Sequence, residues 1–305
     1  MLKEGKNLSI KIKELKKKRD AIILVHNYQL PEVQDIADFR GDSLELSRIA
    51  AKTQAKVIVF CGVYFMAETA SILSPDKLVI MPDISAGCPM ADMMNANDLI
   101  KLKSQHPQAV AVGYVNTSAA VKAELDYCCT SANAVAVVNA LKNEKEIIFI
   151  PDKHLADYVS KQTGRKLITG HGFCPTHVKI LPEDVNREKK IHPQAKVMVH
   201  PECLASVVAL ADLVLSTSQM AKYVQDDSAK EFIIGTESGL IYRLKQDNPD
   251  KEFYLASQRA VCPNMKRTTQ EKVLWALEDL KDEVRVSDEI RNKAYLAIER
   301  MLAII

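Results

Sequence analysis

AIILVH, residues 21–26, is the stretch that decides the fold class, because it is the first of a series of similar apolar runs. The runs are continuous rather than alternating, rich in Val and Ile, and separated by segments with helical patterning. Such runs are typical of parallel strands that helices cover on both faces. The sequence therefore predicts an α/β protein. The other runs are 56–62, 77–82, 109–115, 146–151, 196–200, 213–216, 231–236 and 252–257.

The composition is that of an ordinary folded protein. The 305 residues include 41 Lys plus Arg against 39 Asp plus Glu, and 47% are hydrophobic. This balance excludes disordered and fibrous classes, and a net charge of +2 creates no broad field for nucleic acid or anionic lipid. No apolar run approaches the roughly 20 residues that span a bilayer, and no signal segment follows the lysine-rich start. We therefore expect a cytoplasmic protein without membrane or nucleic-acid partners.

Two common phosphate-binding motifs are missing from the sequence. Neither G-x-G-x-x-G nor G-x-x-x-x-G-K-[ST] follows any of the apolar runs. These motifs bind dinucleotides and nucleoside triphosphates through backbone N–H groups at a helix N-terminus. A nicotinamide-dependent enzyme or an NTPase is therefore not expected.

An internal repeat is the most informative feature. Cys88, Cys174 and Cys262 are each followed by Pro and lie 86 and 88 residues apart. Two further marks precede each cysteine: a polar residue at a strand end, and 15 to 17 residues later a hydroxyl side chain in a turn. Sparse residues that recur in phase with two other marks indicate repeated structural units. The strand-end residues are His26, Asn116 and His200, and the hydroxyl residues are Ser43, Ser131 and Thr217.

The repeat predicts three αβα units with parallel sheets, related by a pseudo-threefold axis around a central site. The predicted boundaries are 1–90, 91–176 and 177–264, and residues 265–305 form C-terminal helices that pack on the body. Trp275 lies among the apolar residues of this last segment and is expected in the core. Ligands of parallel sheets bind beyond the carboxyl ends of strands, where every marked residue lies.

Three thiolates at one point, with no fourth repeat, predict a metal centre with an open coordination position. Structural zinc sites are closed and usually contain C-x-x-C pairs, which this chain lacks. Thiolate ligands suit zinc or an iron–sulfur cluster, and an iron without a protein ligand can act as a Lewis acid in dehydration. The remaining cysteines have no repeat mates and are expected to be buried in the core: Cys61, Cys128, Cys129 and Cys203.

The other marked residues form a set for anion binding and proton transfer. Hydroxyls at turns that open helices favour carboxylate or phosphate, although simple helix capping explains them equally well. Histidine and a desolvated glutamate can exchange protons, and tyrosine can donate to an oxyanion. A loop-capping role remains the alternative for His200 and Glu202. The set comprises His26, Tyr28, Ser43, Tyr114, Asn116, Ser131, His177, His200, Glu202, Ser216 and Thr217.

From about residue 20 to the C-terminus the sequence resembles the quinolinate synthase family. The resemblance rests on many motifs in order, including VHNYQLPEVQDIADFRGDSL, GCPMADM, GFCPTHV, VHPEC, STSQM, GTESGLIYRLK and CPNMKRT. It implies three stacked αβα units with a [4Fe-4S] cluster at their junction. The implied reaction condenses iminoaspartate with dihydroxyacetone phosphate, with loss of phosphate and two waters, to give quinolinate for NAD biosynthesis. An L-aspartate oxidase is then a transient partner that supplies iminoaspartate.

The resemblance also assigns roles to the marked residues. The implied cluster ligands are Cys88, Cys174 and Cys262. The implied substrate contacts are His26, Ser43, Tyr114, Asn116, Ser131, His200, Glu202, Ser216 and Thr217. The implied catalytic residues are Glu202, Tyr114, Tyr28 and His177.

Two other classes stay open at this point. A metal-free module that binds a small dicarboxylate needs the same anion contacts but not three phased cysteines. A zinc hydrolase with a cysteine-rich site would be colourless, oxygen-tolerant and independent of dihydroxyacetone phosphate. The colour of the purified protein separates these classes from an iron–sulfur enzyme.

Overall fold

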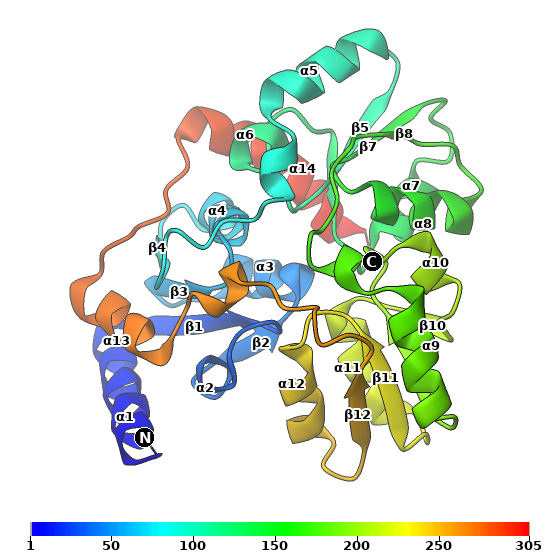
Figure 1. The fold of residues 1–305 in the computed structure, drawn as a ribbon. Helices are drawn as coiled ribbons and strands as arrows, with labels where there is room; N and C mark the ends of the chain where they lie inside the picture. The colour runs from blue at the N-terminus through cyan, green and yellow to red at the C-terminus, as the bar shows by residue number, and fades with distance from the viewer. Residues whose placement is uncertain (1, 305) are drawn as a thin grey trace.

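Three parallel sheets surround a common centre in the computed structural model, which describes residues 2–304 (Figure 1). In that part of the chain every sheet has four strands, and the strand order is the same in each. Taken in chain order within a unit, the second strand lies at one edge, followed by the first, the third and the fourth. The orders are β2-β1-β3-β4, β6-β5-β7-β8 and β10-β9-β11-β12. The predicted α/β fold with three αβα units is therefore confirmed.

Each unit repeats the same succession of elements, beginning with a helix and ending with a short 3-10 helix. The first unit comprises α1 (Leu2–Arg19), β1 (Ala21–His26), α2 (Pro31–Gln34), β2 (Phe39–Gly41), α3 (Ser43–Lys52), β3 (Val57–Cys61), α4 (Tyr64–Leu73), β4 (Leu78–Ile80) and η1 (Ala91–Met93). The second comprises α5 (Ala96–Gln105), β5 (Val110–Tyr114), α6 (Ala119–Lys122), β6 (Tyr127–Cys129), α7 (Ala134–Ala140), β7 (Ile147–Ile150), α8 (Lys153–Thr163), β8 (Ile168–Thr169) and η2 (His177–Lys179). The third comprises α9 (Pro182–Ile191), β9 (Lys196–Val199), α10 (Ala205–Val208), β10 (Leu213–Val214), α11 (Thr217–Asp226), β11 (Glu231–Gly235), α12 (Leu240–Asp247), β12 (Glu252–Leu255) and η3 (Asn264–Lys266).

All nine apolar runs of the sequence contain a strand, whereas three short strands, β2, β6 and β8, give no such run. Each of these has only two or three residues and pairs with a longer strand of its own sheet. A strand this short has too few residues for a periodic pattern. Pairing with a neighbouring strand defines it instead.

The last two helices, α13 (Gln270–Asp279) and α14 (Asp288–Ala303), pack on elements of the first two units. Helix α13 packs on α1 and β3 of the first unit, and α14 packs on β6 and α6 of the second unit and on α4 of the first. Trp275 was expected in the core, but that prediction is wrong, since the side chain is 56% exposed. Val273 and Leu277 form the buried face of α13, and a residue two positions from Val273 lies on the opposite side of a helix.

The basic stretch 11–19 forms the end of α1, whose Ile12 is buried against the core while most of the charged residues face solvent. The predicted domain boundaries fall at the starts of η1 and η2 and inside η3. Met1 and Ile305, the outermost residues of the first and last predicted domains, lie outside the described residues. Within residues 2–304, no helix is both long enough and apolar enough to span a membrane.

Candidate active site

A cavity of about 180 Å³ lies where loops of all three units meet. The first strand of every unit points its carboxyl end at this centre, as parallel sheets require of a ligand site. Every predicted site residue except Ser216 lines the cavity. The lining residues among those predicted are His26, Tyr28, Ser43, Cys88, Tyr114, Asn116, Ser131, Cys174, His177, His200, Glu202, Thr217 and Cys262.

The three phased cysteines lie in loops of the same construction. In each, the cysteine precedes a proline, and the backbone N–H groups two and three residues later face the sulfur. Because proline has no N–H group, the first donors available to the sulfur are those of the next two residues. The donors are Met90 and Ala91 for Cys88, Thr176 and His177 for Cys174, and Asn264 and Met265 for Cys262.

Burial dominates the acidity of these thiols. It raises the pKa of Cys88 to about 12, although the facing N–H groups act in the opposite direction. The pKa values of Cys174 and Cys262 are also raised, again chiefly by burial. A bound cation would offset this cost and release the protons, because metals bind the thiolate form. The donor set therefore fits a thiolate-bound metal group.

The four remaining cysteines are buried away from the cavity, as expected. Cys61, Cys128 and Cys129 lie within strands, and Cys203 donates a weak hydrogen bond from its sulfur to the carbonyl oxygen of Gly235 at 3.4 Å. Their exposed fractions are 1% or less.

Two acidic residues that sequence reasoning missed accept hydrogen bonds from the backbone of the cysteine loops. Glu237 accepts hydrogen bonds from the backbone N–H groups of Cys262 (3.0 Å) and Gly239 (2.7 Å) and pairs with Lys266. Asp152 accepts a backbone N–H of Cys174 in the second unit. Both follow the third strand of their unit. Searching the ends of third strands for polar residues, as was done for first strands, would have found them.

His26 and His200 end or follow the first strands of their units and adopt the same geometry. Nδ1 of each ring accepts the backbone N–H two residues later, from Tyr28 at 3.2 Å and from Glu202 at 3.3 Å. Burial is the main cause that lowers both pKa values to about 3. Both rings are therefore neutral near pH 7, and a neutral imidazole that accepts at Nδ1 donates from Nε2. His200 uses this donor toward Ser131, 3.1 Å away.

Glu202 is a buried carboxylate that lines the cavity. Its Oε2 lies 2.7 Å from Nδ1 of His177, and Tyr114 donates a further hydrogen bond. Burial alone would raise the pKa of Glu202, but the adjacent His177 and the hydrogen bonds from His177 and Tyr114 outweigh it and lower the pKa. The group is thus ionised at neutral pH. Burial raises the pKa of Tyr114, so its phenol stays a donor.

A hydrogen-bonded chain continues from Glu202 through His177 to the first unit. Nε2 of His177 lies 2.8 Å from Oγ1 of Thr236, which lies 2.6 Å from the hydroxyl of Tyr28. If Nδ1–H of His177 donates to the carboxylate, Nε2 accepts from Thr236, which in turn accepts from Tyr28. Thr236 is fully buried, and like Glu237 it follows β11. Sequence reasoning missed this link between two predicted residues.

The hydroxyl residues divide into two groups. Ser43 and Thr217 are the first residues of α3 and α11, and their caps are Asp42 and Ser216, so the capping alternative is wrong for both. Ser216 was expected to contact substrate, but it does not line the cavity: its hydroxyl accepts the N–H of Gln219 and donates to Asp42 at 3.0 Å. A hydroxyl used in this way is not available to a ligand.

Asn116 and a second possible metal group complete the site. Oδ1 of Asn116 is buried without a hydrogen-bond partner in the described chain, so it could accept from a ligand. Donor atoms of Cys174, His177 and Glu202 lie within 4.8 Å of one another. This group shares Cys174 with the predicted trio and could hold a single ion.

Known proteins resemble the chain along nearly its whole length. The family model described as quinolinate synthetase A protein matches residues 10–303. A quinolinate synthase of Dehalococcoides mccartyi (strain CBDB1) is 56% identical over 298 residues, which cover 98% of either chain. That of Thermodesulfovibrio yellowstonii is 56% identical over 292 residues, or 95% of this chain and 96% of the relative. That of Methanosarcina barkeri is 54% identical over 294 residues and 96% of both chains.

Proposed function

The chain belongs to the quinolinate synthase family, and on this premise we propose the substrates, the cofactor and the roles of the residues. The enzyme forms quinolinate for NAD biosynthesis. In the proposal, iminoaspartate condenses with dihydroxyacetone phosphate, and phosphate and two waters leave. An L-aspartate oxidase supplies the iminoaspartate, and the reaction takes place in the cytoplasm.

The observation that carries the proposal is the likeness of the three cysteine loops around one cavity. Cys88, Cys174 and Cys262 would hold a [4Fe-4S] cluster through their sulfurs. A cluster with three protein ligands supplies one iron that can act as a Lewis acid on a hydroxyl or carboxylate oxygen. The backbone N–H groups that face the sulfurs support this role, because hydrogen bonds to thiolates stabilise their charge.

The size and polarity of the cavity support small anionic substrates. The cavity of about 180 Å³ is a concave site lined by loops of all three units, and such a site suits a small acid. Thr217 and the neutral His26 offer donors toward anionic oxygens, and Ser131, which accepts from His200, can donate its own hydroxyl proton. Neutral donors bind an anion without the desolvation of a second buried charge.

Proton transfer is the proposed role of the chain that contains Glu202. Each loss of water requires a proton to leave carbon and another to reach the departing oxygen. Glu202 is ionised and can take the first, while Tyr114 stabilises a developing negative charge. His177, with Thr236 and Tyr28 behind it, can return the proton, because each hydrogen bond in this chain can reverse its direction.

The test is anaerobic purification with an absorption spectrum, iron and sulfide counts, and a quinolinate assay with both substrates. We expect a brown protein with about four irons and four sulfides per chain, as a [4Fe-4S] centre requires. A protein that stays colourless after anaerobic reconstitution, or that makes quinolinate with zinc alone, overturns the proposal.

A single metal ion at Cys174, His177 and Glu202 is the second candidate, since these donors already lie together. A zinc hydrolase would use such a site. Replacing Cys88 or Cys262 by Ser separates the two candidates. Both changes abolish a cluster, whereas the single-ion site keeps all three of its ligands.

A further inference from the structure

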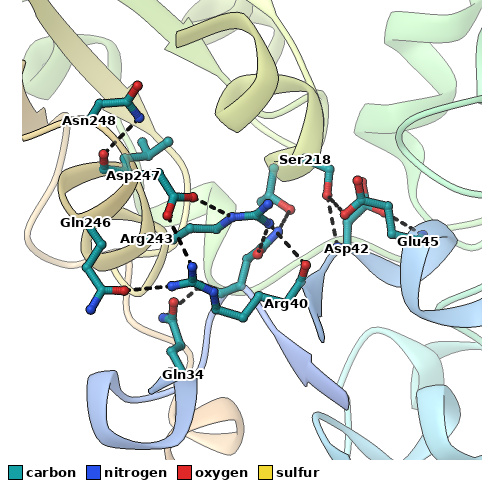
Figure 2. A network of polar contacts seen from close by, with 12 residues as sticks. Gln34, Arg40, Asp42, Glu45, Ser218, Arg243, Gln246, Asp247 and Asn248 are labelled. Carbon is teal, nitrogen blue, oxygen red and sulfur yellow. Dashed lines mark hydrogen bonds and ion pairs between the residues drawn. The ribbon is translucent and has the colours of Figure 1, made fainter. Parts of the chain in front are cut away.

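A polar network joins the first unit to α12 of the third unit (Figure 2). Arg40 of β2 contacts Gln246 at 2.7 Å and Asp247 at 3.1 Å. Arg243, one turn before Asp247, binds the other oxygen of that carboxylate at 3.4 Å and donates to the backbone carbonyl of Arg40. Its guanidinium is thereby held in one orientation between the two units.

Arg243 uses a further N–H on a fully buried amide next to the cavity. Its Nη1 lies 2.6 Å from Oδ1 of Asn27, and Nδ2 of the same amide lies 2.8 Å from Oγ1 of Thr217. Arginine can only donate hydrogen bonds, so the amide oxygen must face it. The NH₂ group must therefore face Thr217.

The direction of the Thr217 hydroxyl follows from this contact. Since Oγ1 accepts from Asn27, the hydroxyl proton points elsewhere, and along residues 2–304 the hydroxyl donates no hydrogen bond. The side chain is 2% exposed and lines the cavity. A donor oriented before the ligand arrives needs no rearrangement on binding.

We propose that Arg243 and Asn27 are positioning residues that hold the Thr217 hydroxyl as a hydrogen-bond donor to an anionic oxygen of the substrate. The inference deepens the proposed function and rests on it, because it concerns an anion in the same cavity. Either a phosphate or a carboxylate oxygen fits this donor. A ligand group that must itself donate is disfavoured, because two donors would then face each other.

The test replaces Asn27 by Asp, which is nearly the same size. The new carboxylate keeps the pair with Arg243 but cannot donate, so the Thr217 hydroxyl must turn to donate to it. Isothermal titration with inorganic phosphate and with quinolinate then measures the affinity of each anion. Loss of one charge-assisted hydrogen bond weakens binding about 10- to 100-fold. The probe that loses affinity identifies the group that Thr217 binds.

A double variant separates positioning from a general disturbance. In the Thr217→Val background no hydroxyl remains to be turned, and Arg243 neutralises the new carboxylate. Asn27→Asp should then weaken binding less than about threefold. The double-mutant cycle would thus assign most of the effect of Asn27→Asp to the Thr217 hydroxyl. Arg40→Gln is the matched control. It breaks contacts between the same two units without touching Asn27, and affinity should stay within about twofold.

Arg243→Met and Arg243→Gln provide a second arm if Asn27→Asp does not fold. Gln keeps a donor for the Asn27 oxygen without the charge, so it should retain more affinity than Met. The inference is overturned if Arg243→Met and Arg243→Gln lose the same affinity. It is also overturned if Asn27→Asp lowers the affinity equally in proteins with and without the Thr217 hydroxyl. If the wild type binds the anions and Asn27→Asp binds both equally well, this inference alone fails. A wild type that binds neither anion refutes the proposed function as well.

Discussion

The cysteine loops are alike in all three units, whereas the ends of the first strands are not. Each loop has a cysteine, a proline and two N–H groups that face the sulfur. At the strand ends, His26 and His200 share one geometry, but the residue two positions later is Tyr28 in one unit and Glu202 in the other. Only the third unit brings a carboxylate to this position.

This contrast separates two requirements of the site. A metal group with several equivalent ligand positions is served by the same loop repeated around an axis. The proposed condensation of two different substrates has no such symmetry, because the proton acceptor and the anion contacts must differ from one side of the cavity to another. The proposed function thus accounts for a repeat that is kept at the sulfurs and lost at the strand ends.

Replacing the cysteine in any one of the three cysteine loops should have the largest effect on activity. Cys88→Ser, Cys174→Ser and Cys262→Ser should each lose the cluster and all quinolinate formation, because the serine hydroxyl is a poor substitute for a soft thiolate. Iron and sulfide counts after anaerobic purification measure this. Cys203→Ser and Cys128→Ser are the controls and should keep the cluster. A Cys262→Ser protein with full iron content would contradict the equivalence of the loops.

Substitutions at Glu202 and Tyr28, the two positions at which the strand ends differ, should lower turnover by unequal amounts. Glu202→Gln keeps size and hydrogen bonding but removes the base, so we expect kcat to fall about 100-fold or more with the cluster intact. Tyr28→Phe removes only the far end of the hydrogen-bonded chain and should cost about tenfold. Steady-state rates and the absorption spectrum of each variant measure both. Equal losses would show that the two positions still act alike.

Ser216 and Thr217, adjacent hydroxyl residues at the start of α11, should differ in their effects on substrate binding and on stability. Thr217→Ala should weaken substrate binding by about 1.5 to 3 kcal/mol, the value of a hydrogen bond to a charged group. Ser216→Ala should leave binding unchanged and lower the free energy of unfolding by about 1 kcal/mol through loss of the cap. Titration calorimetry and thermal unfolding measure the two quantities. If Ser216→Ala weakens binding as much as Thr217→Ala, the cap is not its main role.

The two histidines, in contrast to their neighbours, should behave alike in pH dependence. Their pKa is about 3 in the folded protein and 6.5 as the ordinary value, so below pH 6.5 the unfolded chain binds protons that the folded chain does not. The contribution of these two histidines to the free energy of unfolding is therefore fully present above pH 6.5 and is lost as the pH falls below it. When the pH is lowered from 7.5 to 5.5, each histidine should lower the free energy of unfolding by about 1.4 kcal/mol.

Thermal unfolding of the wild type, His26→Gln and His200→Gln at the two pH values checks this. Each variant should lose about 1.4 kcal/mol less than the wild type over that interval. A loss that does not change in either variant would mean that these rings do not titrate as the structure indicates.

Much of the fold was predictable because its signals are local. The residues of an apolar run such as 21–26 or 146–151 are consecutive in the sequence and also in the strand that they form. Nine of the strands were therefore predicted. The phase of Cys88, Cys174 and Cys262 revealed the repeat without any contact being known. The edge strand β6 and the exposure of Trp275 were not predicted, since both depend on what packs beside them.

Many polar residues of the cavity were predicted from the sequence, but their partners were not. Strand ends, turns and cysteines recur at regular spacing, so the sequence alone indicates that these marked side chains gather at the centre. Thr236 reaches Tyr28 across 208 positions, and Asn27 reaches Thr217 across 190. Such contacts leave no periodic trace in the sequence. Only the packing of one unit against another decides which hydroxyl is turned toward the ligand and which carboxylate stays charged.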